Sequence, residues 1–201
     1  MSKNTFKISL LGDKTVGKTS IVTAYTTNEF NFTTLATIGI DTSITKKVFD
    51  NVEYTFKIFD TAGQEKFNSI STTTIQMAVG FFMVFAVNNR QSYERLVNWI
   101  NYIEEYINLE EKVLFIIGNK IDIKPEEREV TKEEAEEIAK SKNAKYFETS
   151  ALTRSGINEA FEEMFKDVYE MSKSNQNNSS NSSFSLDKDN VNKKKKKCLC
   201  F

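Results

Sequence analysis

Histidine is absent from the 201-residue chain, and cysteine occurs only twice, both times within the last four residues. Without histidine the chain has no histidine general base, no catalytic triad built on one and no histidine metal ligand. The position of the cysteines argues against a secreted domain held by disulfides. No hydrophobic run is long enough to span a bilayer or to resemble a signal peptide, so we expect a cytosolic chain.

Glycine is also scarce, with seven residues in total. Five of them lie in short segments where the backbone must bend or approach a ligand, namely Gly12, Gly17, Gly39, Gly63 and Gly118. The hydrophobic content of 39% allows one sizeable core, and nothing in the pattern indicates two folded domains.

Residues 12–19 read GDKTVGKT and follow the apolar run 6–11. They fit the pattern G-x-x-x-x-G-K-[ST], in which a strand leads through a glycine turn into a helix. Backbone N–H groups, the helix N-terminus and the Lys18 ammonium suit phosphate, and the Thr19 hydroxyl suits Mg²⁺. We expect the phosphate site to consist of Lys14, Thr15, Val16, Gly17, Lys18, Thr19 and Ser20. A glycine turn without a ligand is the alternative.

A second segment supplies a carboxylate. Residues 54–59 alternate between apolar and polar side chains, which predicts a strand that ends at Asp60. We expect Asp60 to bind Mg²⁺ and the N–H of Gly63, three residues later, to reach the terminal phosphate.

Residues 118–122, GNKID, indicate the base. The Asp122 carboxylate can accept from both the ring N–H and the exocyclic amine of guanine, a donor pair that adenine lacks. Asn119 and Lys120 belong to the same segment. In residues 148–151, ETSA, we expect the backbone N–H groups of Ser150 and Ala151 to meet the guanine carbonyl. The predicted cofactors are therefore GTP or GDP, with Mg²⁺.

These segments, in this order, resemble the Ras superfamily of small GTPases over residues 6–171. Residues 37–41 (TIGID), 62–67 (AGQEKF) and 128–130 (REV) are most similar to its Rab branch. The resemblance implies that Thr37 senses the terminal phosphate through Mg²⁺, that Phe30 packs on the guanine edge and that Gln64 orients the attacking water as the catalytic residue. A core phenylalanine and a plain surface glutamine are the alternatives for Phe30 and Gln64.

Alternating strand-like and helix-like runs predict an α/β fold, a parallel sheet covered by helices on both faces. Residues 81–87 and 113–117 have the continuous apolar pattern of strands buried on both faces, and turn residues within 48–52 predict one antiparallel hairpin. Thr131 and Glu134 predict a helix capping box. The resemblance implies the three-layer P-loop NTPase fold with a six-stranded, mostly parallel sheet. Its ligand would bind beyond the carboxyl ends of the strands.

The composition changes near residue 172. We expect a GTPase domain over 1–171, a disordered Ser/Asn-rich linker over 172–192 and a polybasic, prenylated tail over 193–201. Five lysines occupy 193–197, so residues 1–192 carry a net charge of −6 against −1 for the whole chain. The tail ends either in a C-a-a-X box on Cys198 or in a pair of lipidated cysteines, Cys198 and Cys200. Lipid and lysines together would anchor the chain to an anionic membrane.

The resemblance also implies partners and a location. We expect a guanine nucleotide exchange factor, a GTPase-activating protein, effectors that bind the switch regions and a carrier of the prenyl-escort or GDP-dissociation-inhibitor type, and no nucleic acid. The chain would be a monomer at the cytoplasmic face of intracellular membranes that cycles through the cytosol. The sequence names neither the compartment nor the individual partners.

Two positions in the phosphate loop depart from the family. Lys14 and Thr15 stand where Ras proteins have glycines, and there they would either crowd the terminal phosphate or, through the Lys14 charge, assist catalysis. We expect slow hydrolysis. At the surface where Rab proteins have three aromatic residues, this chain has Thr42, Phe59 and Thr74, so we expect different effectors.

Two functions fit these observations. One is a prenylated GTPase switch in vesicle trafficking, and the other is a membrane adaptor that binds GTP with very slow or absent hydrolysis. A phosphate-loop kinase is disfavoured, because residues 119–122 are suited to reading a base.

Overall fold

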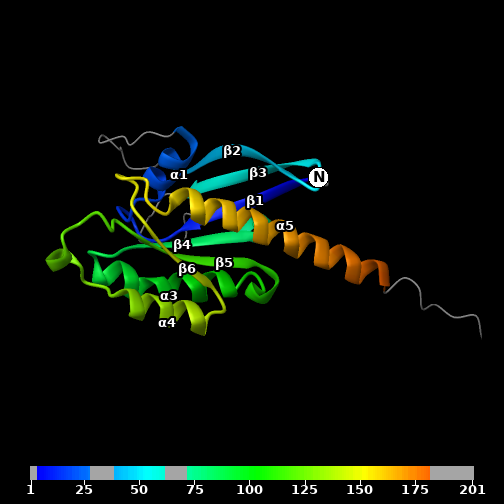
Figure 1. Cartoon of the computed structure of the whole chain (residues 1–201). Coiled ribbons are helices and arrows are strands. Elements are labelled where there is room, and N and C mark those ends of the chain that lie inside the picture. The colour runs from blue at the N-terminus through cyan, green and yellow to red at the C-terminus, as the bar shows by residue number, and fades with distance from the viewer. Residues whose placement is uncertain (1–3, 28–38, 62–71, 182–201) are drawn as a thin grey trace, which may run out of the picture.

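The computed structural model describes residues 4–27, 39–61 and 72–181, and in this part of the chain six strands form one sheet (Figure 1). The strand order across the sheet is β2-β3-β1-β4-β5-β6. The strands are β1 (Thr5–Leu11), β2 (Ile40–Phe49), β3 (Val52–Thr61), β4 (Gly80–Ala86), β5 (Val113–Asn119) and β6 (Lys145–Thr149). The prediction of a six-stranded P-loop fold is confirmed.

Four of the five strand pairs are parallel, and only β2 and β3 run antiparallel. The hairpin between β2 and β3 turns at Asp50 and Asn51, whose φ angles are 48° and 62°. Two successive positive φ angles are typical of the two-residue turn that best matches the twist of paired strands. The predicted antiparallel hairpin is therefore confirmed.

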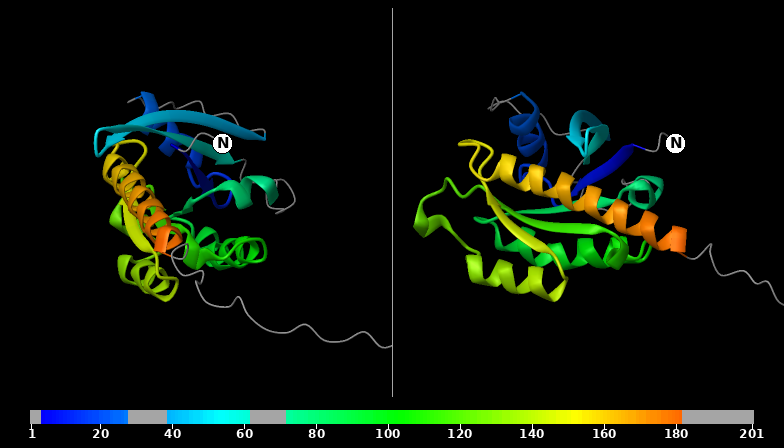
Figure 2. Two further views of the ribbon diagram at one scale, coloured as in Figure 1. Left: turned by 90° about the vertical axis from the view of Figure 1, so that its right-hand side faces the viewer. Right: turned by 45° about the vertical axis from the view of Figure 1, so that its right-hand side comes forward.

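Helices cover both faces of the sheet (Figure 2). One face packs against α1 (Lys18–Thr27) and α5 (Ile157–Asn181), and the other against α2 (Thr72–Met77), α3 (Arg90–Glu104) and α4 (Lys132–Ser141). The central strand β4 is buried along its whole length and feeds both cores alternately. Phe82 and Val84 contribute to the first core, and Phe81, Met83 and Phe85 to the second. This alternation follows from the two-residue period of a strand.

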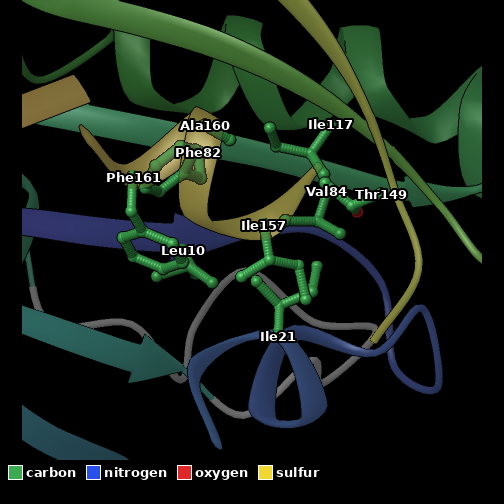
Figure 3. Close-up of a pocket in the computed structure, with 9 residues that line it drawn as sticks. All are labelled: Leu10, Ile21, Phe82, Val84, Ile117, Thr149, Ile157, Ala160 and Phe161. Atoms are coloured by element: carbon green, nitrogen blue, oxygen red, sulfur yellow. The ribbon is translucent and has the colours of Figure 1, made fainter. Parts of the chain in front are cut away.

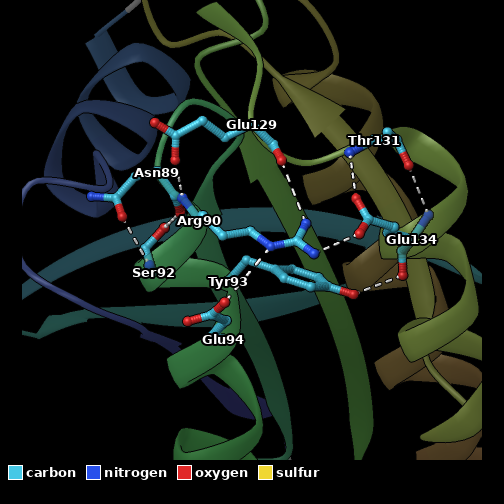
Figure 4. A network of polar contacts seen from close by, with 8 residues as sticks. All are labelled: Asn89, Arg90, Ser92, Tyr93, Glu94, Glu129, Thr131 and Glu134. Atoms are coloured by element: carbon cyan, nitrogen blue, oxygen red, sulfur yellow. Dashed lines mark hydrogen bonds and ion pairs between the residues drawn. The ribbon is translucent and has the colours of Figure 1, made fainter.

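A polar network joins α3 to α4 (Figure 4). Arg90 donates to the Glu134 carboxylate at 2.7 Å, and the Tyr93 hydroxyl donates to the Glu134 carbonyl at 2.8 Å. Thr131 and Glu134 form the predicted capping box at the start of α4. Hydrogen bonds from Arg90 and from the Thr131 backbone lower the pKa of Glu134 to about 2.

Helix α5 differs from the sequence-based expectation. It continues to Asn181, whereas we predicted a disordered linker from residue 172. No proline or glycine interrupts residues 157–181, and the ion pair between Lys173 and Asp50, at 2.7 Å, holds the helix to the β2–β3 turn just beyond the expected boundary. None of the helices among the described residues is long and apolar enough to cross a membrane.

Candidate functional site

The predicted site residues that the structure describes gather at one edge of the sheet. The phosphate loop follows β1, Asp60 is near the end of β3, Asn119 ends β5 and Ser150 follows β6. Parallel strands place their carboxyl ends together, and the antiparallel strand β2 leaves this arrangement undisturbed because it lies at the margin of the sheet.

Two glycines give the phosphate loop its shape. Gly12 and Gly17 have φ angles of 140° and 98°, which L-residues rarely adopt. A Cβ atom at Gly12 would lie 2.1 Å from the Val84 carbonyl oxygen, and one at Gly17 would lie 2.3 Å from the Asn119 side-chain nitrogen. The glycines of the motif are therefore needed for close packing of the loop on β4 and β5 as well as for backbone freedom.

Lys18 is the buried cation of the loop, with 5% of its surface exposed. Its ammonium donates to the carbonyl oxygens of Gly12 and Asp13, at 2.7 Å each. Burial lowers the pKa of Lys18 to about 8, although the charges of Asp60 and Asp13 act in the opposite direction. A cation held in this way, at the N-terminal end of α1, is suited to receive an anion.

Thr19 and Asp60 bring two oxygen ligands together. The Thr19 hydroxyl of α1 donates to an Asp60 carboxylate oxygen of β3 at 2.5 Å. Asp60 is only 3% exposed. Across the described residues no group of three or more carboxylate, histidine or cysteine side chains could hold a metal by itself. One hydroxyl and one carboxylate fit Mg²⁺, which usually shares its coordination with substrate phosphates and water.

Asn119 connects the phosphate loop to the end of β6. Its side-chain nitrogen donates to the Val16 carbonyl at 2.8 Å, and its side-chain oxygen accepts from the Thr149 hydroxyl at 3.1 Å. Asn119 is 1% exposed. The Asn119 amide thus ties the phosphate loop to the ends of β5 and β6, and the assignment of this residue to base recognition stays a prediction.

Asp122 and Ser150 form a contact between the loops that follow β5 and β6. The Ser150 hydroxyl donates to an Asp122 carboxylate oxygen at 2.5 Å and accepts from the Thr153 N–H at 3.0 Å. The Ser150 N–H donates to the Ser155 carbonyl at 3.0 Å, whereas we expected it to meet a guanine carbonyl; that contact stays a prediction. The Ser150 hydroxyl, which holds the carboxylate, was missed because sequence gives no sign of side-chain direction.

Lys120 follows Asn119 directly in the sequence. Its φ angle is 72°, in the left-handed region, and burial lowers the pKa of its ammonium against the opposing effect of Asp122. An unusual backbone conformation in a non-glycine residue is common at ligand sites. Ala151, the neighbour of Ser150, is buried.

Lys14 and Thr15 are both exposed at the top of the phosphate loop. Thr15 has a φ angle of 61°, a strained conformation for a β-branched residue. Six predicted residues lie outside the described part of the chain and remain predictions: Phe30, Thr37, Gly63, Gln64, Cys198 and Cys200.

A small cavity lies between α1, α5 and the sheet (Figure 3). Its lining includes Leu10, Ile21, Ile157 and Phe161, which belong to the first core. The polar side chain among them, Thr149, donates its hydroxyl to Asn119. The cavity is therefore a packing gap in the core and no candidate for the ligand site.

The fold and the loop define a phosphate-loop nucleotide-binding protein of the Ras-like type. Comparison with protein families agrees, because the Ras family model matches residues 7–170. The chain therefore belongs to the Ras family of small GTPases.

Rab proteins are among the relatives of this chain. The chain is 37% identical to Ras-related protein Rab-8B of Homo sapiens over 171 residues, which cover 85% of this chain and 81% of that protein. It is 36% identical to Rab-8A of Bos taurus over 163 residues, covering 81% of this chain and 78% of the relative. It is 34% identical to Rab-11C of Dictyostelium discoideum over 171 residues, which cover 85% of this chain and 75% of that protein.

Proposed function

We propose that the chain is a Rab-like switch that binds GTP or GDP with Mg²⁺, hydrolyses GTP and works on intracellular membranes in vesicle trafficking. The observation that carries this proposal is the 2.5 Å contact between the Thr19 hydroxyl and the Asp60 carboxylate, next to the buried Lys18. Two ligands of the kind that Mg²⁺ prefers thus meet beside a cation at a helix N-terminus. The similarity to Rab proteins supports the trafficking role.

In this proposal Lys18 binds phosphate together with the backbone of the loop, which consists of Lys14, Thr15, Val16, Gly17, Thr19 and Ser20. Thr19, Asp60 and Thr37 hold Mg²⁺, which when bound would offset the negative charge of the phosphates. The Lys18 ammonium, now shared between two carbonyls, gains an anionic partner and with it a higher pKa.

For the base, Asp122 accepts from the two N–H donors on one edge of guanine. The Ser150 hydroxyl fixes the carboxylate in place, and the contact with the guanine carbonyl falls to the N–H of Ala151. Asn119 and Lys120 hold the segment around the base, and Phe30 packs on its edge. The polar groups that contact guanine therefore come from loops after β5 and β6.

The chemistry and the regulation rest on residues outside the described part of the chain. Gln64 orients the attacking water, and the Gly63 N–H reaches the terminal phosphate. Ordering of the segments around Thr37 and Gly63 recruits effectors in the GTP state, and hydrolysis releases them. An exchange factor, an activating protein and a prenyl-binding carrier complete the cycle, with the lipid attached at Cys198, Cys200 or both.

The experiment follows single-turnover phosphate release from the full chain loaded with GTP and Mg²⁺, with ATP as competitor and Gln64→Leu as the control variant. We expect hydrolysis in the wild type, its loss in the variant and no competition by ATP. Efficient competition by ATP would contradict guanine specificity and with it the proposal.

A second function is favoured by Lys14 and by the left-handed Thr15, which both occupy the rim of the phosphate loop. With them the chain would be an adaptor that holds GTP with very slow hydrolysis. Tight GTP binding without turnover, unchanged in Gln64→Leu, would support the adaptor. The double variant Lys14→Ser/Thr15→Gly then tests the cause, because we expect it to restore turnover if these side chains block it.

A further inference from the structure

Asp13 occupies one of the variable positions of the phosphate-loop motif, yet it is almost fully buried, at 9% exposure. Its carboxylate accepts from the indole N–H of Trp99 at 2.9 Å and pairs with the Arg95 guanidinium at 3.1 Å. Arg95 and Trp99 are four residues apart and therefore lie on the same side of α3. Two donors from one helix thus hold the side chain of one loop residue.

The backbone of Asp13 connects this contact to the phosphate site. Its carbonyl oxygen accepts from the Lys18 ammonium at 2.7 Å. The side chain of Asp13 therefore contacts α3, while its main chain contacts the lysine that the proposed function assigns to phosphate. A shift of Asp13 away from α3 would move an oxygen that positions this lysine.

The loop needs such support because it is strained. Thr15, two residues after Asp13, has a φ angle of 61°, where a β-branched residue is unfavourable. A strained backbone persists when surrounding contacts over-determine it. On one side of Thr15 the contacts are those of Asp13 with α3, and on the other Asn119 holds the Val16 carbonyl.

We propose that Asp13, Arg95 and Trp99 form a tether that holds the strained phosphate loop in its phosphate-binding shape and thereby sets the rate of nucleotide release. The three are positioning residues, because they act through the loop and through Lys18. This inference rests on the proposed function of guanine nucleotide binding. A loop that is held in its bound shape lowers the free-energy cost of binding, and such effects are expressed mainly in the dissociation rate.

The test measures dissociation of fluorescent GDP from the full chain in the presence of Mg²⁺ after a chase with unlabelled GDP. We expect Asp13→Ala to speed release by about tenfold, and Trp99→Phe or Arg95→Gln by about three- to fivefold, since each loses hydrogen bonds to a charged group. Arg90→Gln is the matched control, an arginine of the same helix whose ion pairs join Glu94 and Glu134, and its release rate should equal that of the wild type.

Two combinations separate the tether from a general loss of stability. Asp13→Ala/Trp99→Phe should release GDP no faster than Asp13→Ala alone, because both changes break the same contact. Thr15→Gly should slow release from Asp13→Ala toward the wild-type rate, because it removes the strain that the tether opposes. Association rates should stay unchanged throughout.

Trp99→Phe keeps an aromatic ring in the core and serves if Asp13→Ala fails to fold. Release within twofold of the wild type in both variants, or strictly additive effects, would overturn the tether while leaving nucleotide binding intact. A wild-type chain that takes up no guanine nucleotide would overturn the proposed function, and the tether with it.

Discussion

The two ends of the candidate site differ in how complete they are. At the base end, Asn119, Thr149, Ser150 and Asp122 hydrogen-bond to one another or to nearby backbone, so this end is assembled within the protein. At the phosphate end, burial depresses the pKa of Lys18 and Thr15 holds a left-handed backbone, and Lys120 at the base end shares both features. Under the proposed function, the polar groups of the base end are already paired before guanine binds, whereas the buried Lys18 gains an anionic partner only with the nucleotide.

The largest expected effect is the loss of GDP affinity when Asp122, at the base end, is replaced. Asp122→Asn replaces a double acceptor by an amide whose NH₂ group faces the donors of guanine, so GDP affinity should fall about a thousandfold or more. Titration with fluorescent GDP measures this loss. Xanthosine diphosphate, which has a carbonyl in place of the exocyclic amine, is the control ligand and should bind the variant better than GDP. Equal binding of GDP by variant and wild type would contradict the assignment of Asp122.

The next largest effect is expected at the phosphate end, where replacing Lys18 should change GDP affinity and stability in opposite directions. Lys18→Met keeps the length of the side chain and removes its charge, so GDP affinity should fall about a hundredfold because charge-assisted hydrogen bonds are lost. The nucleotide-free variant should nevertheless be at least as stable as the wild type, because no cation is buried. Titration with GDP and thermal unfolding without nucleotide measure the two quantities.

The same variant gives a pH dependence. Because folding lowers the pKa of Lys18 from 10.5 to about 8, the unfolded chain binds more protons between these values, and stability conferred through this group rises with pH across that window. Between pH 7.5 and pH 10 the gain should be about 2 kcal/mol for the nucleotide-free wild type relative to Lys18→Met. Urea unfolding of both proteins at pH 7.5 and pH 10 measures it, and parallel curves would contradict the buried, depressed lysine.

A smaller effect is expected on stability when Thr15, at the phosphate end, is replaced. Thr15→Gly relieves the left-handed strain, partly offset by the greater entropy of glycine in the unfolded chain, so the free energy of unfolding should rise by about 1 kcal/mol. Thermal unfolding of the nucleotide-free protein measures this gain. Gly17→Thr is the contrasting change, because its Cβ atom would meet the Asn119 side chain, and it should destabilise the fold.

The smallest effect is expected on stability at Glu134, which lies outside the candidate site. Glu134→Gln weakens the α3–α4 network and should lower stability slightly, with no change in GDP affinity. Because folding lowers the pKa of Glu134 from 4.5 to about 2, this contribution should be present above pH 4.5 and be lost as the pH falls toward 2. Acid unfolding of the two proteins compares it, and a shift in GDP affinity would contradict the separation of the network from the site.

The sequence predicted the sheet, the hairpin and the phosphate loop because their signals are local. Apolar runs, a two-residue turn and the spacing of Gly12, Gly17 and Lys18 all lie within a few residues of the structure that they determine. The capping box at Thr131 was predicted for the same reason.

The features that the sequence missed depend on contacts between distant segments. Asp13 contacts residues 82 and 86 positions away in α3, and no pattern near Asp13 indicates them. The Ser150 N–H donates to the Ser155 carbonyl because the loop after β6 turns back on itself, and helix α5 continues past residue 171, where Lys173 pairs with Asp50 of the hairpin turn. Such choices among side-chain and backbone partners are made by tertiary packing.

The chain contains a single tryptophan, and its indole N–H donates to the phosphate loop. Indole emission responds to the hydrogen bonds and the charge around the ring. The protein therefore carries its own optical probe at the loop, and under the proposed function we expect the arrival or departure of a nucleotide to change the fluorescence of Trp99 in the unlabelled chain.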